Sequence, residues 1–282
     1  MTNISKEPIT FRTDDGVTLG GTLYRPQQVP KRVVVLSGGT GIPEGFYRRF
    51  ATWLAQDKGM ACLSYTYRDM QDPSPAKMRV SRATMADWGI LDGQGARDAA
   101  RAIFPDLEMW VIGHSLGAMC LSKQPRLDGI TRVIAICSGL VDQARHPFPF
   151  RFLVYLFWHV IGPISTSILG YLPGQTIGLG STVPASAFWQ WRRWCTSGRL
   201  GVLADDSLPP SDWSRSGAPV KIVATRDDLI CPPPCARHLE DAFDSATVTH
   251  LVLDPADKGA KSLGHLGVFS RTGAAFWDDI LA

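Results

Sequence analysis

The sequence predicts an α/β protein in which a mostly parallel sheet is wrapped by helices. Its length of 282 residues and its 45% hydrophobic content are enough for one large core with a substantial insertion. Short apolar runs, typical of strands buried on both faces, occur at residues 32–36, 60–67, 108–112 and 132–137. Segments with apolar residues at helical spacing separate these runs, and this alternation is typical of parallel sheets with crossover helices.

Both ends of the chain extend this sheet. Runs at 9–13 and 17–24 are separated by an Asp-Gly pair, which predicts a hairpin and therefore an antiparallel edge. The alternation stops after the run at 132–137 and resumes with strands at 220–225 and 248–253. We therefore expect a first core segment, an insertion and a second core segment, which span residues 1–140, 141–215 and 216–282.

The insertion is apolar and rich in aromatic residues. Residues 152–191 contain no Asp, Glu, Lys or Arg. Gly162-Pro163 and the serine- and threonine-rich stretch after it interrupt the longest apolar run, and a bilayer span needs roughly twenty continuous apolar residues. We therefore predict a soluble cap over the core. A membrane-contacting lid and a true span are the alternatives.

A glycine-flanked serine follows the strand at 108–112. Residues 113–117 read G-H-S-L-G, and glycines two positions before and after a serine permit the sharp turn from a strand into a helix. Such a corner exposes the serine hydroxyl. It also directs the Leu116 amide toward the place where a negative oxygen develops in acyl transfer. We interpret Ser115 as a nucleophile, with an ordinary turn serine as the alternative.

The glycine-rich turn at 37–41 follows another central strand. It contains neither G-x-G-x-x-G nor a Walker lysine, so a phosphate cradle is the weaker interpretation. A loop with freely aimed amides fits the second half of an oxyanion hole. We predict Gly39 as the amide donor, with Thr40 as the next candidate.

A serine nucleophile needs a base, normally a histidine that a carboxylate holds in one tautomer. His265 lies in a glycine-flanked loop after the last strand, at the carboxyl edge where open α/β sheets bind ligands. His114 lies in the serine turn itself and is expected to point away. Asp227 and Asp228 end the preceding strand, and the turn toward Pro232 favours Asp228 as the partner of His265.

The chain order Ser115, Asp228, His265 resembles that of the α/β-hydrolase superfamily, and the resemblance covers nearly the whole chain. The sequence is most similar to a bacterial group of predicted serine hydrolases. Thr225 stands where the superfamily often has a glycine before the acid, and Ser37 where many relatives have a histidine. The motifs that carry the resemblance are GTLYRP (21–26), FYRRFA (46–51), YTYR (65–68), ATMADWG (83–89), the serine turn and GHLGVF (264–269).

The resemblance implies the α/β-hydrolase fold with an aromatic cap, and a serine-dependent esterase or thioesterase. In this interpretation Ser115, Asp228 and His265 form the triad, and the Leu116 and Gly39 amides form the oxyanion hole. Aromatic residues next to a nucleophile often form a pocket wall, so an apolar or aromatic acyl group is expected. The predicted substrate contacts are Phe152, Tyr155, Trp158 and Trp189. An acyltransferase with the same site, a cofactor-free lyase and a ligand-binding protein are the alternatives.

Composition narrows the expected partners. The net charge of +3 and the lack of a basic run interleaved with aromatics argue against nucleic acid. No cofactor is implied, and a spacer of three prolines between Cys231 and Cys235 argues against a metal site. We expect a small-molecule acyl substrate, free or carrier-bound, and no membrane contact. The amino-terminal residues lack the pattern of a signal peptide, so we expect a cytoplasmic protein without disulfides. The sequence does not define the oligomeric state.

Overall fold

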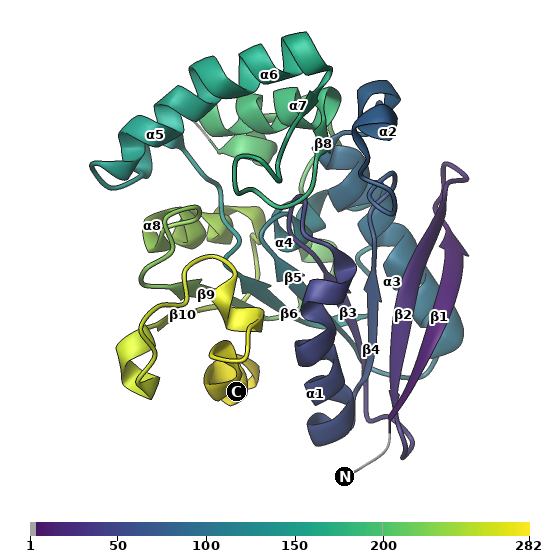
Figure 1. The fold of residues 1–282 in the computed structure, drawn as a ribbon. Helices are drawn as coiled ribbons and strands as arrows, with labels where there is room; N and C mark the ends of the chain where they lie inside the picture. Colours follow the sequence, from purple (N-terminus) through teal and green to yellow (C-terminus); the bar gives the residue numbers. More distant parts are fainter. Residues whose placement is uncertain (1–3, 199) are drawn as a thin grey trace.

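The computed structural model describes residues 4–198 and 200–282 (Figure 1). Over these residues, eight strands form one sheet in the order β1-β2-β4-β3-β5-β6-β9-β10. The strand β2 pairs antiparallel with β1 and β4, and the remaining pairs are parallel. The strands are β1 (Ile4–Arg12), β2 (Thr18–Pro26), β3 (Val33–Ser37), β4 (Ala61–Tyr65), β5 (Met109–His114), β6 (Ile130–Ile136), β9 (Val220–Thr225) and β10 (Val248–Leu253). The mostly parallel sheet and the antiparallel edge predicted from the sequence are confirmed.

Helices cover both faces of this sheet, as the continuous apolar runs of the central strands require. In β3, Val33 and Val35 face the core beneath α3, whereas Val34 and Leu36 face the core beneath α1 and α9. Alternating side chains of one strand therefore fill two separate cores. The core helices are α1 (Arg48–Lys58), α2 (Pro75–Val80), α3 (Gly93–Ile103) with a π-helical turn before it (Asp87–Asp92), α4 (Leu116–Met119), α8 (Pro233–Arg237) and α9 (Trp277–Leu281).

The insertion forms a cap on the α4 side of the sheet (Figure 1). Among the described residues, those within 141–215 add no strand to the eight-stranded sheet. The cap consists of α5 (Phe150–Leu156), a π-helical turn (Phe157–Ile161), α6 (Gly162–Leu169), a short ribbon of β7 (Tyr171–Leu172) and β8 (Val183–Pro184), and α7 (Ala185–Thr196).

The helix continues through Gly162-Pro163 from Phe150 to Leu169, and the expectation that its apolar stretch is too short to span a bilayer is wrong by length and composition. The π-helical turn precedes the proline, and the Gly162 amide bonds to the Phe157 carbonyl in the wider π pattern. This wider turn gives the proline ring room that a regular α-helix lacks. A Cβ at residue 162 would overlap the Phe188 ring, so this glycine also lets α6 pack closely against α7.

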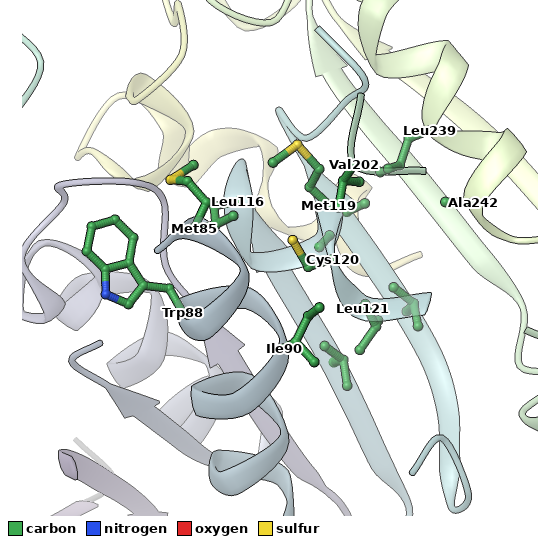
Figure 2. Close-up of a cluster of buried hydrophobic side chains, with 14 of the residues drawn as sticks. Met85, Trp88, Ile90, Leu116, Met119, Cys120, Leu121, Val202, Leu239 and Ala242 are labelled. Carbon is green, nitrogen blue, oxygen red and sulfur yellow. The ribbon is translucent and has the colours of Figure 1, made fainter. Parts of the chain in front are cut away.

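The helix α4, which starts directly after Ser115, lies in the larger buried core. Figure 2 shows Met85, Trp88 and Ile90 beside Leu116 and Cys120 of this region. The segment before α3 therefore packs on the residues that follow the predicted nucleophile. This packing fixes the position of the serine turn within the core.

Candidate active site

Ser115 occupies a strained corner between β5 and α4. Its φ of 52° and ψ of −116° lie outside the regions that non-glycine residues favour. Hydrogen bonds hold the corner in place: the Ser115 amide donates to the Ile136 carbonyl at 3.0 Å, and the Ser138 hydroxyl donates to the Ser115 carbonyl at 2.5 Å. Strain that neighbouring bonds maintain in this way is typical of functional sites.

The two glycines of the serine turn are required by close backbone contacts. A Cβ at Gly113 would overlap the backbone of Gly117 and Ala118, and one at Gly117 would overlap the Ser37 carbonyl. The serine turn therefore packs directly on the end of β3. The sequence pattern thus has the structural context that a nucleophile turn requires.

The loop after β9 brings Asp228 against His265. Asp228 Oδ2 lies 2.8 Å from His265 Nδ1, and Asp228 Oδ1 accepts from the Ile230 and Cys231 amides at 2.8 and 2.9 Å. Burial alone would raise the pKa of Asp228, but the bonds from His265 and from these amides outweigh it and hold this pKa below the usual value. An ionised carboxylate only accepts, so this hydrogen bond places a proton on His265 Nδ1.

The adjacent Asp227 points to the backbone of the same loop. Its carboxylate accepts from the Ser262 hydroxyl at 2.6 Å and from the Leu263 and Gly264 amides at 2.9 and 3.0 Å. Burial opposes ionisation here too, but these bonds lower the pKa of Asp227 below its usual value. Asp227 therefore anchors the loop that carries His265, whereas Asp228 contacts the ring.

Ser115 and His265 line the same cavity, which has a volume of about 290 Å³ and lies between the core and the cap. Leu116, Met119 and Thr40 line its floor from the core. The cap contributes a wall of apolar side chains, namely Phe150, Leu153, Val154, Phe157, Trp158 and Ile161. The cavity is thus suited to an apolar group held next to the serine hydroxyl.

Of the four aromatic residues predicted to contact substrate, one lines the cavity and three do not. Trp158 is buried and lines the cavity, but Phe152, Tyr155 and Trp189 are exposed and do not line it. The expectation for these three residues is wrong because it followed aromatic character instead of helical periodicity. The lining positions 150, 153, 154, 157, 158 and 161 repeat at helical spacing, and this pattern in the sequence could have identified them.

The expectation for Gly39 also needs correction. Its amide donates to the Tyr47 hydroxyl at 2.7 Å and is therefore already engaged. Thr40, the next candidate in the sequence, lines the cavity. The hydroxyl of Tyr67 donates to the Gly38 carbonyl at 2.7 Å, so tyrosines outside the loop fix its conformation. Sequence reasoning missed these tyrosines, although both lie within the motifs FYRRFA and YTYR.

His114 connects the loops around the cavity. Its Nε2 lies 3.0 Å from the backbone carbonyl of His265, which only accepts, so this nitrogen carries the proton. Its Nδ1 then accepts from the Tyr47 hydroxyl at 2.8 Å. Burial, with a smaller contribution from the nearby His265, lowers the pKa of His114 to about 3, so the ring stays neutral. Continuous hydrogen bonds thus link Gly39, Tyr47, His114 and His265.

Cys137 lies beside the paired Asp228 and His265. One ligand atom from each of these residues lies within 4.8 Å of the others, close enough to surround a metal ion. However, Asp228 Oδ2 and His265 Nδ1 already bond to each other at 2.8 Å, and Asp228 Oδ1 accepts from two backbone amides, so a metal ion would have to replace existing hydrogen bonds. The chemistry of this donor set therefore disfavours a metal ion. The six cysteines, which all lie in the described part of the chain, are free.

Comparison with known proteins gives the class of fold. No family model and no curated protein matches this chain. Among solved structures, the α/β hydrolase GrgF from Penicillium sp. sh18 is similar with a TM-score of 0.59 and 17% identity, over 98% of each chain. The esterase Pf2001 from Pyrococcus furiosus is similar with a TM-score of 0.58 and 15% identity, over 98% of this chain and 90% of that chain. An esterase domain from Rhodothermus marinus has a TM-score of 0.55 and 14% identity, over 98% of this chain and 96% of that chain. The chain therefore has the fold of the α/β-hydrolase superfamily.

The neutral state of His114 predicts that the folded protein loses stability at acid pH. Folding lowers the pKa of this ring. Its contribution to the free energy of unfolding is therefore fully present above pH 6.5, the pKa of the unfolded state, and is lost as the pH falls toward 3. Urea unfolding at several pH values should show a decline of up to about 1.4 kcal/mol per pH unit from this group. His114→Gln removes the titrating ring and should show a shallower decline. Equal slopes for the two proteins would contradict this assignment.

Proposed function

We propose that the chain is a serine-dependent acyl hydrolase that acts on esters or thioesters with an apolar acyl group. One observation carries this proposal: Ser115 and His265 line a single apolar cavity, while His265 Nδ1 lies 2.8 Å from the buried Asp228. The proposed nucleophile, base and acid come from separate segments of the chain. The similarity in fold to structures named as esterases supports the same reaction class.

In the proposed mechanism, each group acts through a stated atom. His265 Nε2 takes the proton of the Ser115 hydroxyl as the serine oxygen attacks the acyl carbonyl. Asp228 keeps the proton on Nδ1 and stabilises the charged ring that forms. The amides of Leu116 and Thr40 donate to the tetrahedral oxyanion. His265 then protonates the leaving group, and water releases the acyl group by the same steps in reverse order.

The cavity supplies the proposed preference for apolar acyl groups. The ring of Trp158 and the aliphatic residues of the same cap helix form its wall, and Met119 and Leu116 form part of its floor. Burial of each additional methylene against such a surface contributes about 0.8 kcal/mol. Longer acyl chains should therefore react faster until the cavity is full.

Replacement of the nucleophile is the first test. Ser115→Ala should lower turnover of an ester substrate by up to roughly a million-fold, because covalent catalysis is lost while the oxyanion donors remain. Mass spectrometry should detect an acyl adduct in the wild type and none in the variant. Ser122→Ala is a matched control, since this hydroxyl bonds to Ser211 instead. A Ser115→Ala enzyme that keeps more than about a tenth of the turnover would exclude the acyl-enzyme mechanism.

The adjacent carboxylates give the second test. Asp228→Asn should lower turnover by roughly ten-thousand-fold, because the amide favours the wrong tautomer of His265. Asp227→Asn should reduce activity much less, and should instead lower thermal stability because it weakens the anchor of the Ser262–Gly264 backbone. Both variants should be assayed at one pH, with folding checked by circular dichroism. The reverse pattern of activities would assign the acid to Asp227.

The cap wall gives the third test. Activity on a series of alkanoyl esters should rise by about fourfold per methylene and then level off. Trp158→Leu should shift the preferred length upward, because the buried indole limits the cavity. Trp189→Leu is the matched control, since this indole is 42% exposed and does not line the cavity. A flat profile, or an equal shift for both variants, would refute the proposed acyl pocket.

A further inference from the structure

The outer side of the cap carries an apolar face that extends beyond the cavity wall. The helix from Phe150 to Leu169 is 20 residues long, contains Arg151 as its one Asp, Glu, Lys or Arg, and has only 22% of its most apolar stretch buried. By length and composition it is apolar enough to cross a membrane. Six of its large apolar side chains are between 36% and 76% exposed: Phe152, Leu153, Val160, Ile161, Ile164 and Ile168. We call these six residues the outer cap face.

The opposite side of this helix packs against the rest of the protein. Val154, Trp158, Gly162 and Thr166 are buried, and the contact between Gly162 and Phe188 fixes the helix against α7. Figure 1 shows α5 and α6 along the outer edge of the cap, with α7 on their inner side. Because one side of the helix forms the cavity wall, only the other side is available to a partner. This arrangement suits a helix that lies along a membrane surface, not one that crosses it.

The charges around the outer cap face select the kind of partner. Residues 143–204, which include the whole of this helix, contain no Asp or Glu, and the nearest acidic residues of the cap in sequence are Asp142 and Asp205. Arg145 and Arg151 are exposed near the start of the helix, and Arg192 bonds to the Trp158 carbonyl and to His159 beside its π-helical turn. A second copy of the chain that docked through this same face would bring the same positive charges and be repelled. Anionic phospholipid headgroups complement them.

The outer cap face also reaches the cavity. Leu153 and Ile161 belong to this face and line the cavity at the same time. An acyl chain leaving a lipid layer would therefore stay in contact with apolar side chains until it reaches Ser115. In place of the cap without membrane contact expected from the sequence, we propose that the outer cap face binds the surface of an anionic phospholipid membrane, from which the cavity takes up acyl substrates. The uptake rests on the function proposed above, whereas the binding does not.

Vesicle sedimentation tests the binding. The Ser115→Ala protein should sediment with phosphatidylcholine vesicles that contain phosphatidylglycerol, more strongly than with phosphatidylcholine alone, and less at high salt. Ile164→Ser together with Ile168→Ser should weaken this binding by at least about tenfold, because both side chains are lost from the lipid contact. Val29→Ser together with Val252→Ser is the matched control. These valines are exposed on the α/β core domain, outside the cap, so membrane binding should be unchanged.

Each outcome decides the proposal. Sedimentation that depends on Ile164 and Ile168 but not on the control pair supports it. Absence of sedimentation, or equal binding by both double variants, overturns it. A wild-type dimer in light scattering that the Ile164 and Ile168 substitutions dissociate also overturns it, since the face would then be a contact between copies. Because the sedimentation assays use the Ser115→Ala protein and light scattering contains no substrate, these results are independent of catalysis, which ester turnover by the wild type tests separately.

Discussion

The arrangement of the site depends on the neutral ring of His114. The ring donates to the backbone carbonyl of His265 and accepts from Tyr47, whose hydroxyl in turn accepts from the Gly39 amide. A second proton on this ring would turn the acceptor for Tyr47 into a donor and place a positive charge 4.9 Å, between ring centroids, from His265. Burial prevents this by lowering the pKa of His114. The residue beside the proposed nucleophile thus has a structural role: it joins the serine turn, the glycine-rich loop and the histidine loop.

The two carboxylates after β9, Asp227 and Asp228, fix different parts of His265 and its loop. Asp228 orients the ring of His265, and Asp227 binds the backbone just before it, while His114 binds its carbonyl. Ring, preceding backbone and carbonyl are therefore fixed from separate directions. Catalysis requires groups held to within a fraction of an ångström, and contacts to both ring and backbone limit the motion of a loop residue.

The sequence predicts those features that local patterns determine. Continuous apolar runs identified the buried strands, and the order of Ser115, Asp228 and His265 placed these residues at one edge of the sheet. The engagement of Gly39 could not be predicted, because it depends on Tyr47 returning from the next helix to meet the loop. Pro163 did not break the cap helix, because a π-helical turn precedes it, and nothing in the local composition indicates such a turn. The residues of the cavity wall could have been predicted from helical periodicity. They were missed because the prediction chose residues for their aromatic character instead.

The cap helix combines two requirements that usually belong to different helices. A surface helix normally has one apolar stripe, and a helix that is apolar all round is normally buried in protein or lipid. Here Trp158 and its neighbours at helical spacing face the cavity, while Ile164 and Ile168 face outward, so the helix is apolar on both sides with protein on only one. Contiguous exposed apolar side chains of this kind usually mark a binding surface. A lipid layer on the outer side would satisfy the composition of the whole helix, and would place the entrance of the cavity where apolar substrates are concentrated.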